Sequence, residues 1–281
     1  MKKLNFRVAA LAAAAAAAIA APAIAGHSWG GYHWAGNGTN ITLRINKAIT
    51  SQWVQSVDTA IADWEVSNEL TLPYGDVSVS RKRCNPISGQ ILVCNDSYGQ
   101  RGWLGIASIW LSNGHISQGT TKLNDSYFNT ATYDTPAWRS LVACQEIGHD
   151  FGLDHQDEGF GPPNLGTCMD YTNDPDGGGA YGPSNEHPNT HDYDMLNSIY
   201  GHNDGFTTSK PATNFGVREV GRPAAPGAAG IGDSPSDWGR AIHNDGLGRP
   251  DVYVKDLGPG QKVITHVFWA MGEGPHGRLE H

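Results

Sequence analysis

The sequence predicts an exported α+β domain followed by a linker and a short β tail. Three observations lead to this fold class: a leader-like N-terminus, an order of alternating strands and amphipathic helices between residues 26 and 202, and four cysteines that all follow the leader. An even number of cysteines in an exported chain favours disulfides. We expect a twisted mixed sheet with helices packed against it.

Residues 1–25 have the composition of a secretory signal peptide. Lys2, Lys3 and Arg7 precede an alanine-rich run that Pro22 ends, and the small residues 23–25 are typical of a cleavage site. The apolar run is shorter than the ~20 residues that span a bilayer. We therefore expect a secreted or periplasmic protein with no membrane contact after signal cleavage.

Charge excludes one class of partner. The 281 residues include 28 acidic and 19 basic side chains, a net charge of −9, and loss of the leader with its three cations makes it −12. Phosphate contacts need clustered lysine and arginine, and no basic run is longer than the three residues 81–83. We expect no nucleic-acid partner.

The first half of the domain reads as strands around one helix. Alternating Ile41, Leu43 and Ile45 predict a strand, and the apolar stripe from Trp53 to Trp64 predicts a helix that begins near Thr50. The remaining predicted elements are a strand toward Cys84, a short strand before Cys94, and a hairpin of residues 103–111 and 115–123 around Asn113-Gly114.

The second half reads as two helices, a linker and a hairpin. Thr135 or Asp134 caps a helix that runs to about Gly152, and a last helix runs from about Pro188 to Tyr200. One folded domain is expected to cover residues 26–202, with a flexible linker at 203–237 and a tail at 238–281. Residues 251–254 and 262–270 predict a hairpin in that tail. It could join the sheet, serve secretion or be trimmed.

The stretch CQEIGHDFGLDH, residues 144–155, carries the chemistry. Gln145 and His149 are four residues apart, so both side chains can reach one ion from a single helix face. Gly152 permits a sharp turn that can return His155 as a third ligand. Glu146 lies beside the ion rather than on it. The pattern predicts an open zinc site.

This stretch resembles the HExxHxxGxxH signature of the metzincin zinc metallopeptidases, and departs from it at Gln145. Met169 in GTCMDY matches the family's Met-turn, and the helix ending at Tyr200 is similar to the closing helix of the matrixin branch. Residues 103–111 resemble the antiparallel edge strand that lines the substrate cleft. The likeness covers residues 40–201.

The resemblance implies a zincin domain with an active-site helix, and a zinc endopeptidase that acts on proteins or peptides. Glu146 would take a proton from the attacking water and pass it to the leaving amine. The resemblance leaves Tyr171 with two candidate roles: its phenol stabilises the transition state, or its side chain packs under the loop.

Gln145 leaves three hypotheses open. Its amide oxygen, a weaker donor than imidazole, could complete an active site with His149 and His155. The site could instead hold metal without turnover or be empty, which would make the domain a catalytically silent protein- or peptide-binding module. Finally, another residue could be the third ligand.

The cysteines favour two bridges. Cys144 directly precedes the signature and Cys168 directly precedes Met169, so a bridge between them would join the helix to the Met-turn. A bridge between Cys84 and Cys94 would close a small loop. A thiolate zinc site competes with this interpretation.

Other polar residues are given less weight. Asp154, Asp157, Glu158 and the loop 173–179 could bind calcium, or could be a solvated acidic loop. The remaining histidines are expected to be ordinary structural residues: His115, His187, His191, His202, His243 and His266.

Overall fold

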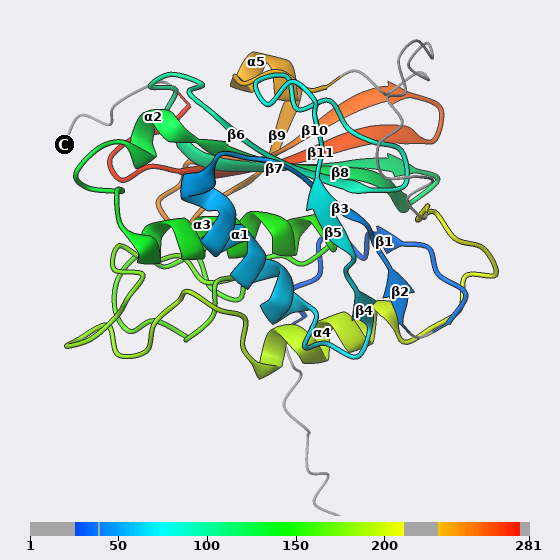
Figure 1. Cartoon of the computed structure of the whole chain (residues 1–281), viewed down its shortest axis with the longest axis horizontal. Coiled ribbons are helices and arrows are strands. Elements are labelled where there is room, and N and C mark those ends of the chain that lie inside the picture. Colours follow the sequence, from blue (N-terminus) through cyan, green and yellow to red (C-terminus); the bar gives the residue numbers. More distant parts are fainter. Residues whose placement is uncertain (1–25, 39, 211–229, 276–281) are drawn as a thin grey trace, which may run out of the picture.

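The computed structural model describes residues 26–38, 40–210 and 230–275, and these form an α+β fold (Figure 1). The predicted signal peptide, the linker residues 211–229 and residues 276–281 of the tail lie outside the described residues. The helices are α1 (Ser51–Trp64), α2 (Asp125–Phe128), α3 (Pro136–Asp150), α4 (Thr190–Tyr200) and α5 (Pro235–Trp238).

The strands are short at the N-terminus and long in the middle and at the C-terminal end. They are β1 (His33–Trp34), β2 (Ile41–Thr42), β3 (Ile45–Ala48), β4 (Leu70–Thr71), β5 (Tyr74–Asp76), β6 (Ile91–Asp96), β7 (Trp103–Ser112), β8 (His115–Asn124), β9 (Arg240–Asn244), β10 (Pro250–Gly258) and β11 (Gln261–Trp269).

In the described part of the chain, nine of these strands form one mixed sheet. Its order is β5-β3-β6-β8-β7-β11-β10-β9, with β1 added beside β8. Pairing is parallel from β5 to β8 and antiparallel from β8 to β9. The predicted mixed sheet is therefore present, and β2 and β4 form a separate small pair.

The helices α1, α3 and α4 lie on one side of the sheet (Figure 1). The apolar stripe predicted for α1 is buried: Trp53, Val57, Ala60, Ile61 and Trp64 have at most 2% of their surface exposed. They share a core with α3 and with the inward side chains of β3, β6 and β7. Burial of this stripe, rather than helix propensity alone, holds α1 in place.

The C-terminal hairpin is not a separate tail. β11 pairs with β7 along nearly its whole length, from Gln261 opposite Ser112 to Trp269 opposite Trp103. The prediction that residues 103–111 form an edge strand is therefore wrong. Both strands have the alternating pattern that a sheet interior accepts, and a sequence does not say which edge a hairpin will join.

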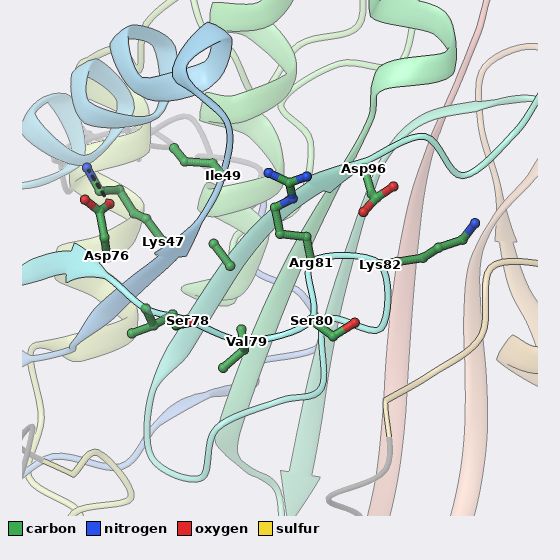
Figure 2. A pocket seen from close by; sticks show the side chains of 11 residues that line it. Lys47, Ile49, Asp76, Ser78, Val79, Ser80, Arg81, Lys82 and Asp96 are labelled. Atoms are coloured by element: carbon green, nitrogen blue, oxygen red, sulfur yellow. Dashed lines mark ion pairs between the residues drawn. The ribbon is translucent and has the colours of Figure 1, made fainter. Parts of the chain in front are cut away.

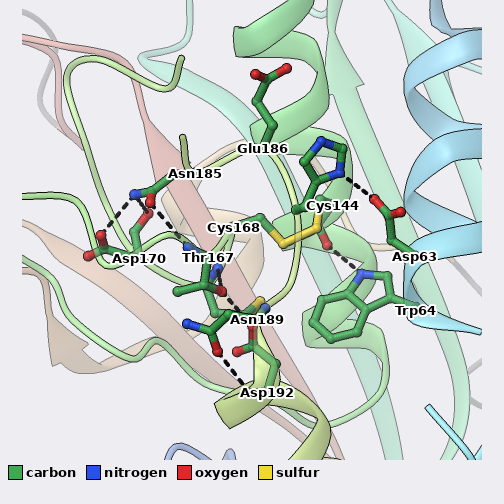
Figure 3. Close-up of a disulfide and its surroundings, with 12 residues drawn as sticks. Asp63, Trp64, Cys144, Thr167, Cys168, Asp170, Asn185, Glu186, Asn189 and Asp192 are labelled. Carbon is green, nitrogen blue, oxygen red and sulfur yellow. Dashed lines mark hydrogen bonds and ion pairs between the residues drawn. A yellow bond between two sulfur atoms is a disulfide. The ribbon is translucent and has the colours of Figure 1, made fainter. Parts of the chain in front are cut away.

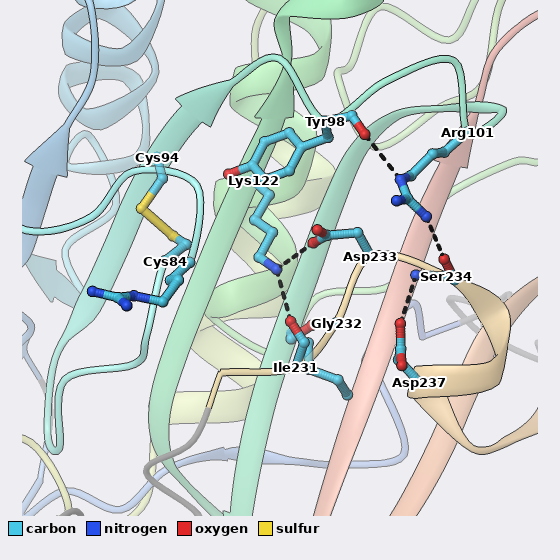
Figure 4. Close-up of polar contacts among 12 residues, drawn as sticks. Cys84, Cys94, Tyr98, Arg101, Lys122, Ile231, Gly232, Asp233, Ser234 and Asp237 are labelled. Carbon is cyan, nitrogen blue, oxygen red and sulfur yellow. Dashed lines mark hydrogen bonds and ion pairs between the residues drawn. A yellow bond between two sulfur atoms is a disulfide. The ribbon is translucent and has the colours of Figure 1, made fainter.

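Part of the predicted linker is also ordered against the sheet. Lys122 of β8 is buried, and its Nζ donates at 2.7 Å to both Ile231 O and Asp233 Oδ1 (Figure 4). Arg101 donates to Ser234 Oγ at 2.6 Å. Trp238 of α5 packs with aromatic side chains of β7 and β11 on the sheet face opposite α3. The C-terminal segment thus covers this face as well as the edge of β7.

One predicted strand is absent, since residues 77–90 contain no strand. Val77 N still donates to Lys47 O at 2.9 Å, and the chain then turns away. Cys84 has a φ of 44°, which breaks an extended run. Its disulfide with Cys94 anchors this excursion to β6.

Candidate metal centre

Helix α3 carries the central residues of the signature. Thr135 caps it by accepting a bond from Trp138 N at 3.2 Å, and Pro136 occupies its first position. The helix packs against β7 and β8, so the side of it that faces the sheet is buried. Gln145, Glu146 and His149 all have 0% exposure.

The turn after α3 returns the chain toward His149. Gly152 has a φ of 92°, and a Cβ there would lie 2.1 Å from Tyr32 O, so only glycine fits. His149 Nδ1 donates to Leu153 O at 2.8 Å, which leaves Nε2 with its lone pair free. His155 follows this turn, and its ring centroid lies 4.9 Å from that of His149.

A third histidine comes from the C-terminal hairpin. His266 on β11 lies with its ring centroid 3.8 Å from His149 and 4.4 Å from His155. One ligand atom from each of His149, His155 and His266 falls within 4.8 Å of the others. We call these three residues the buried cluster. His266, expected from the sequence to be an ordinary structural residue, therefore lies beside two of the predicted ligands.

A signal for His266 was present in the strand pattern. Ile264 and Phe268 face the main core, and His266 shares their side of β11. A buried histidine at an inward position of an apolar strand needs a polar partner. Sequence reasoning missed it because that partner lies over a hundred residues away.

The buried cluster has more polar atoms than hydrogen bonds. No hydrogen-bond partner is present for Nε2 of His149, for either ring nitrogen of His155 or His266, or for the amide of Gln145 and the carboxylate of Glu146. Burial lowers the pKa of His149 and of His266 well below the usual value, which favours neutral rings with free lone pairs. An ion bound between the rings would satisfy these orphaned donors.

Glu146 lies between α3 and β7. A Cβ at Gly105 would lie 2.6 Å from Glu146 Oε1, so a glycine leaves the space that this carboxylate fills. Burial, and next the charge of Asp150, raises the pKa of Glu146 well above its usual value.

The loop between α3 and α4 is joined to α3 by a disulfide. The structure contains Cys144–Cys168 (Figure 3) and Cys84–Cys94 (Figure 4), the pairing that the sequence favours. Thr167 Oγ1 donates to Asp192 Oδ2 of α4 at 2.5 Å and accepts from Met169 N at 3.0 Å. A Cβ at Gly148 would lie 2.7 Å from the Met169 sulfur, which places Met169 directly against α3.

Tyr171 also lies at the buried cluster. Its ring centroid is 4.1 Å from that of His155, and its hydroxyl donates to Asp251 Oδ2 at 3.5 Å. It stacks on Phe160 and is 1% exposed. In this conformation Tyr171 is both packed and close to the histidines, so neither of its predicted roles is removed.

The acidic residues near the site do not form a carboxylate-only group. In the described ranges, every set of three donors that could share an ion contains a histidine, and Glu158 belongs to such a set with His155 and Asp251. The calcium site considered from the sequence gains no support. A polar pocket lies elsewhere, at the end of β3 and β6, and none of the predicted site residues line it (Figure 2).

Comparisons with known proteins add limited information. No protein-family model and no curated protein matches the chain. Among solved structures, it is similar to myroilysin at 14% identity and a TM-score of 0.35, over 63% of this chain and 98% of that one. It is also similar to high choriolytic enzyme 1, a hatching enzyme zinc-protease of the medaka fish Oryzias latipes, at 12% identity and a TM-score of 0.31, over 56% and 88% of the two chains. Both TM-scores lie below 0.5, so the function is inferred from the residues of this chain.

Proposed function

We propose that the protein is a secreted zinc-dependent endopeptidase, described here in a closed form. The observation that carries the proposal is the buried cluster itself: Nε2 of His149 and both ring nitrogens of His155 and His266 converge without hydrogen-bond partners, beside the Glu146 carboxylate of α3. Three imidazoles are a donor set that zinc accepts readily.

The chain's residues fit that ion. His149 is oriented by its bond to Leu153 O, as ligating histidines usually are by their second nitrogen. Gln145, one helical turn before His149, has an amide oxygen without a partner and is the candidate additional donor on α3. Zinc bound here would polarise the scissile carbonyl and lower the pKa of a coordinated water.

Glu146 is the candidate general base. It would take the proton of the attacking water and deliver it to the amine of the leaving group, so that one carboxylate serves both halves of the reaction. Tyr171, at van der Waals range of His155, is the candidate donor to the oxyanion. Met169 supports α3 from below at Gly148.

The closed form must open for a substrate to bind. β11 occupies the edge of β7, where an extended peptide would add as a strand, and the catalytic groups are buried beneath it. Displacement of the hairpin would free that edge and remove His266. Gln145, His149 and His155 would then be the remaining donor set, with one position open for water.

The disulfides support the proposed secreted location. The described chain has two disulfides and no free cysteine, as expected of an oxidising compartment. None of its helices is long and apolar enough to cross a bilayer.

A catalytically silent domain is the second candidate. The complete burial of Gln145, Glu146 and His149 favours this candidate. An ion held by Gln145 and the three histidines of the buried cluster would have four protein donors, which is the pattern of a closed structural site. In that case the C-terminal hairpin stays in place, and any peptide partner would bind elsewhere on the molecule.

Peptide hydrolysis before and after opening separates the two. The full chain is nicked with trypsin at Arg218, within the segment 211–229, and the C-terminal fragment is then removed. We expect casein hydrolysis to appear in the opened chain, to be blocked by a chelator, and to be absent from Glu146→Gln treated in the same way. His187→Ala, an exposed residue paired with Asp63, is the matched control and should behave as the parent.

Retained near-UV circular dichroism shows that the opened chain is folded. If it unfolds, full-length Lys122→Met replaces it, because loss of the Lys122–Asp233 pair loosens the same segment without a cut. If the nicked chain and the Lys122→Met chain are both folded and loaded with zinc but hydrolyse no casein, the proposal of an enzyme is overturned and the catalytically silent domain remains.

A further inference from the structure

A second group of histidines lies at the rim of the sheet. β1 pairs in parallel with β8 so that His33 stands opposite His115, the first residue of β8. The chain after α4 returns to the same place: Asp204 N donates to Gly36 O at 2.9 Å, and Gly36 N donates to Asp204 Oδ2 at 2.8 Å. This brings His202 and Asp204 beside the other two. We call His33, His115, His202 and Asp204 the rim cluster.

Asp204 Oδ1 is the common neighbour of the three rings, and one ligand atom from each of His33, His115 and Asp204 lies within 4.8 Å of the others. Asp204 Oδ1 lies 3.4 Å from Nε2 of His33, 3.4 Å from Nε2 of His115 and 3.1 Å from Nε2 of His202. The Nε2 atoms of His33 and His202 are 3.2 Å apart. The ring of His33 is nearly perpendicular to both other rings, at 80° and 78°.

Hydrogen bonds account for only part of this arrangement, because a proton on Nε2 of His202 can serve either Asp204 Oδ1, at 3.1 Å, or Nε2 of His33, at 3.2 Å. His33 Nδ1 donates to Gly31 O at 2.9 Å, so a neutral His33 ring presents a lone pair at Nε2. That lone pair faces the carboxylate oxygen of Asp204. Protonated rings would form charge-assisted bonds of about 2.7–2.9 Å, and all three contacts to Asp204 are longer.

A tetrahedral ion accounts for it. Donors placed 2.0–2.1 Å from zinc at tetrahedral angles stand about 3.3–3.4 Å from each other. The four distances given above, 3.1 to 3.4 Å, lie at or near this value. Gly36 and Gly31 hold the second atoms of Asp204 and His33, as the outer partners of metal ligands usually do.

We propose that His33, His115, His202 and Asp204 form a second, structural site for a zinc-like divalent ion. Four protein donors leave no open position, which is the pattern of a structural rather than a catalytic site. The ion would join three segments distant in sequence: the N-terminal strand, the start of β8 and the chain after α4.

The N-terminal segment that this ion would hold also reaches the buried cluster. Trp29 lies with its ring centroid 5.5 Å from His149 and 5.6 Å from His266, and Trp29 N donates to Gly152 O at 2.8 Å. The rim ion would therefore fix the segment that covers two of the buried histidines. The proposal does not depend on peptidase activity.

The test is zinc content of the full-length protein after equilibration with zinc and gel filtration, by mass spectrometry of the metal. We expect two equivalents in the parent, one in His202→Ala, one in His149→Ala, and none in the double variant. Cobalt(II) added to zinc-free His149→Ala should give the strong visible absorption of a tetrahedral site, and His187→Ala should match the parent.

The counts distinguish the two sites. Two equivalents of zinc in His202→Ala, or none in His149→Ala, would overturn the proposed rim site. One equivalent of zinc in the parent that persists in His149→Ala would support the rim site and contradict zinc binding at the buried cluster. Asp204→Asn keeps the shape of the side chain and gives the same comparison if His202→Ala fails to fold. Near-UV circular dichroism reports folding of each variant.

Discussion

The buried cluster and the rim cluster use the same side chain in opposite settings. His149 and His266 have no exposed surface, and their cluster closes only when β11 docks on β7. In the rim cluster, by contrast, 14%, 22% and 47% of the His33, His115 and His202 side chains are exposed. Burial makes unpartnered nitrogens costly in the first and tolerable in the second. Substitutions at the buried cluster should therefore have large effects, whereas the rim cluster should respond mainly to whether an ion is bound.

The largest expected effect is on catalysis at the buried cluster. Glu146→Gln removes the base and keeps the shape, so hydrolysis by the opened chain should fall by about 10²–10⁴-fold. Zinc content should remain that of the parent, because Glu146 is not a ligand in this proposal. Loss of zinc in Glu146→Gln would place the carboxylate on the ion and contradict its role as base.

The next effect concerns the hairpin that closes the buried cluster. Lys122→Met leaves Asp233, which is 23% exposed, without its partner. Removing one member of a buried pair costs about 3–5 kcal/mol, and the exposure of Asp233 reduces this to about 1–3 kcal/mol. Hydrogen exchange should accelerate in residues 230–238 and in β11, and less in α1. Equal acceleration in α1 would show that the segment does not open separately.

Two glycines offer a matched pair between the clusters. A Cβ at Gly105 would lie 2.6 Å from Glu146 Oε1 and 2.7 Å from Val142 Cγ1, so Gly105→Ala should cost about 1–3 kcal/mol in overpacking and displace Glu146. A Cβ at Gly36, beside Asp204, would meet Ile41 Cδ1 at 3.5 Å and Gly38 O at 3.6 Å, both ordinary contacts. Urea denaturation should find Gly36→Ala close to the parent. Equal loss in both variants would remove the contrast.

The smallest effect is expected at the rim without metal. In a chelator, His202→Ala should change the free energy of unfolding by less than about 0.5 kcal/mol, because the side chain is half exposed. With zinc present, the parent should gain stability that the variant does not. Thermal unfolding in both buffers measures the difference, and the same gain in parent and variant would contradict ion binding at the rim.

Local patterns predicted the elements between residues 40 and 201 well. The stripe of α1, the cap and signature of α3 and the Asn113-Gly114 hairpin all depend on neighbours in sequence. The hairpin of β10 and β11 was also predicted, because its own turn and alternation define it. The place where it docks was not, since pairing β11 with β7 depends on which edge is free.

The two clusters show the same limit. Gln145, Glu146, His149 and His155 are readable because one helix and one turn carry them all. His266, His33 and His115 come from strands whose partners are remote, so only the fold brings them to their clusters. The short spacing of His202 and Asp204 was a usable sign of chelation, but without His33 and His115 it did not suggest a four-donor site.

β11 follows every other part of the buried cluster in sequence, and this order has a consequence for folding. His266 is synthesised after β7, α3 and the turn at Gly152, so these parts can pack before it is present. Contacts between segments this far apart in sequence form late and slowly. Until β11 pairs with β7, that edge of the sheet has no strand partner, so the proposed open form precedes the closed form during folding.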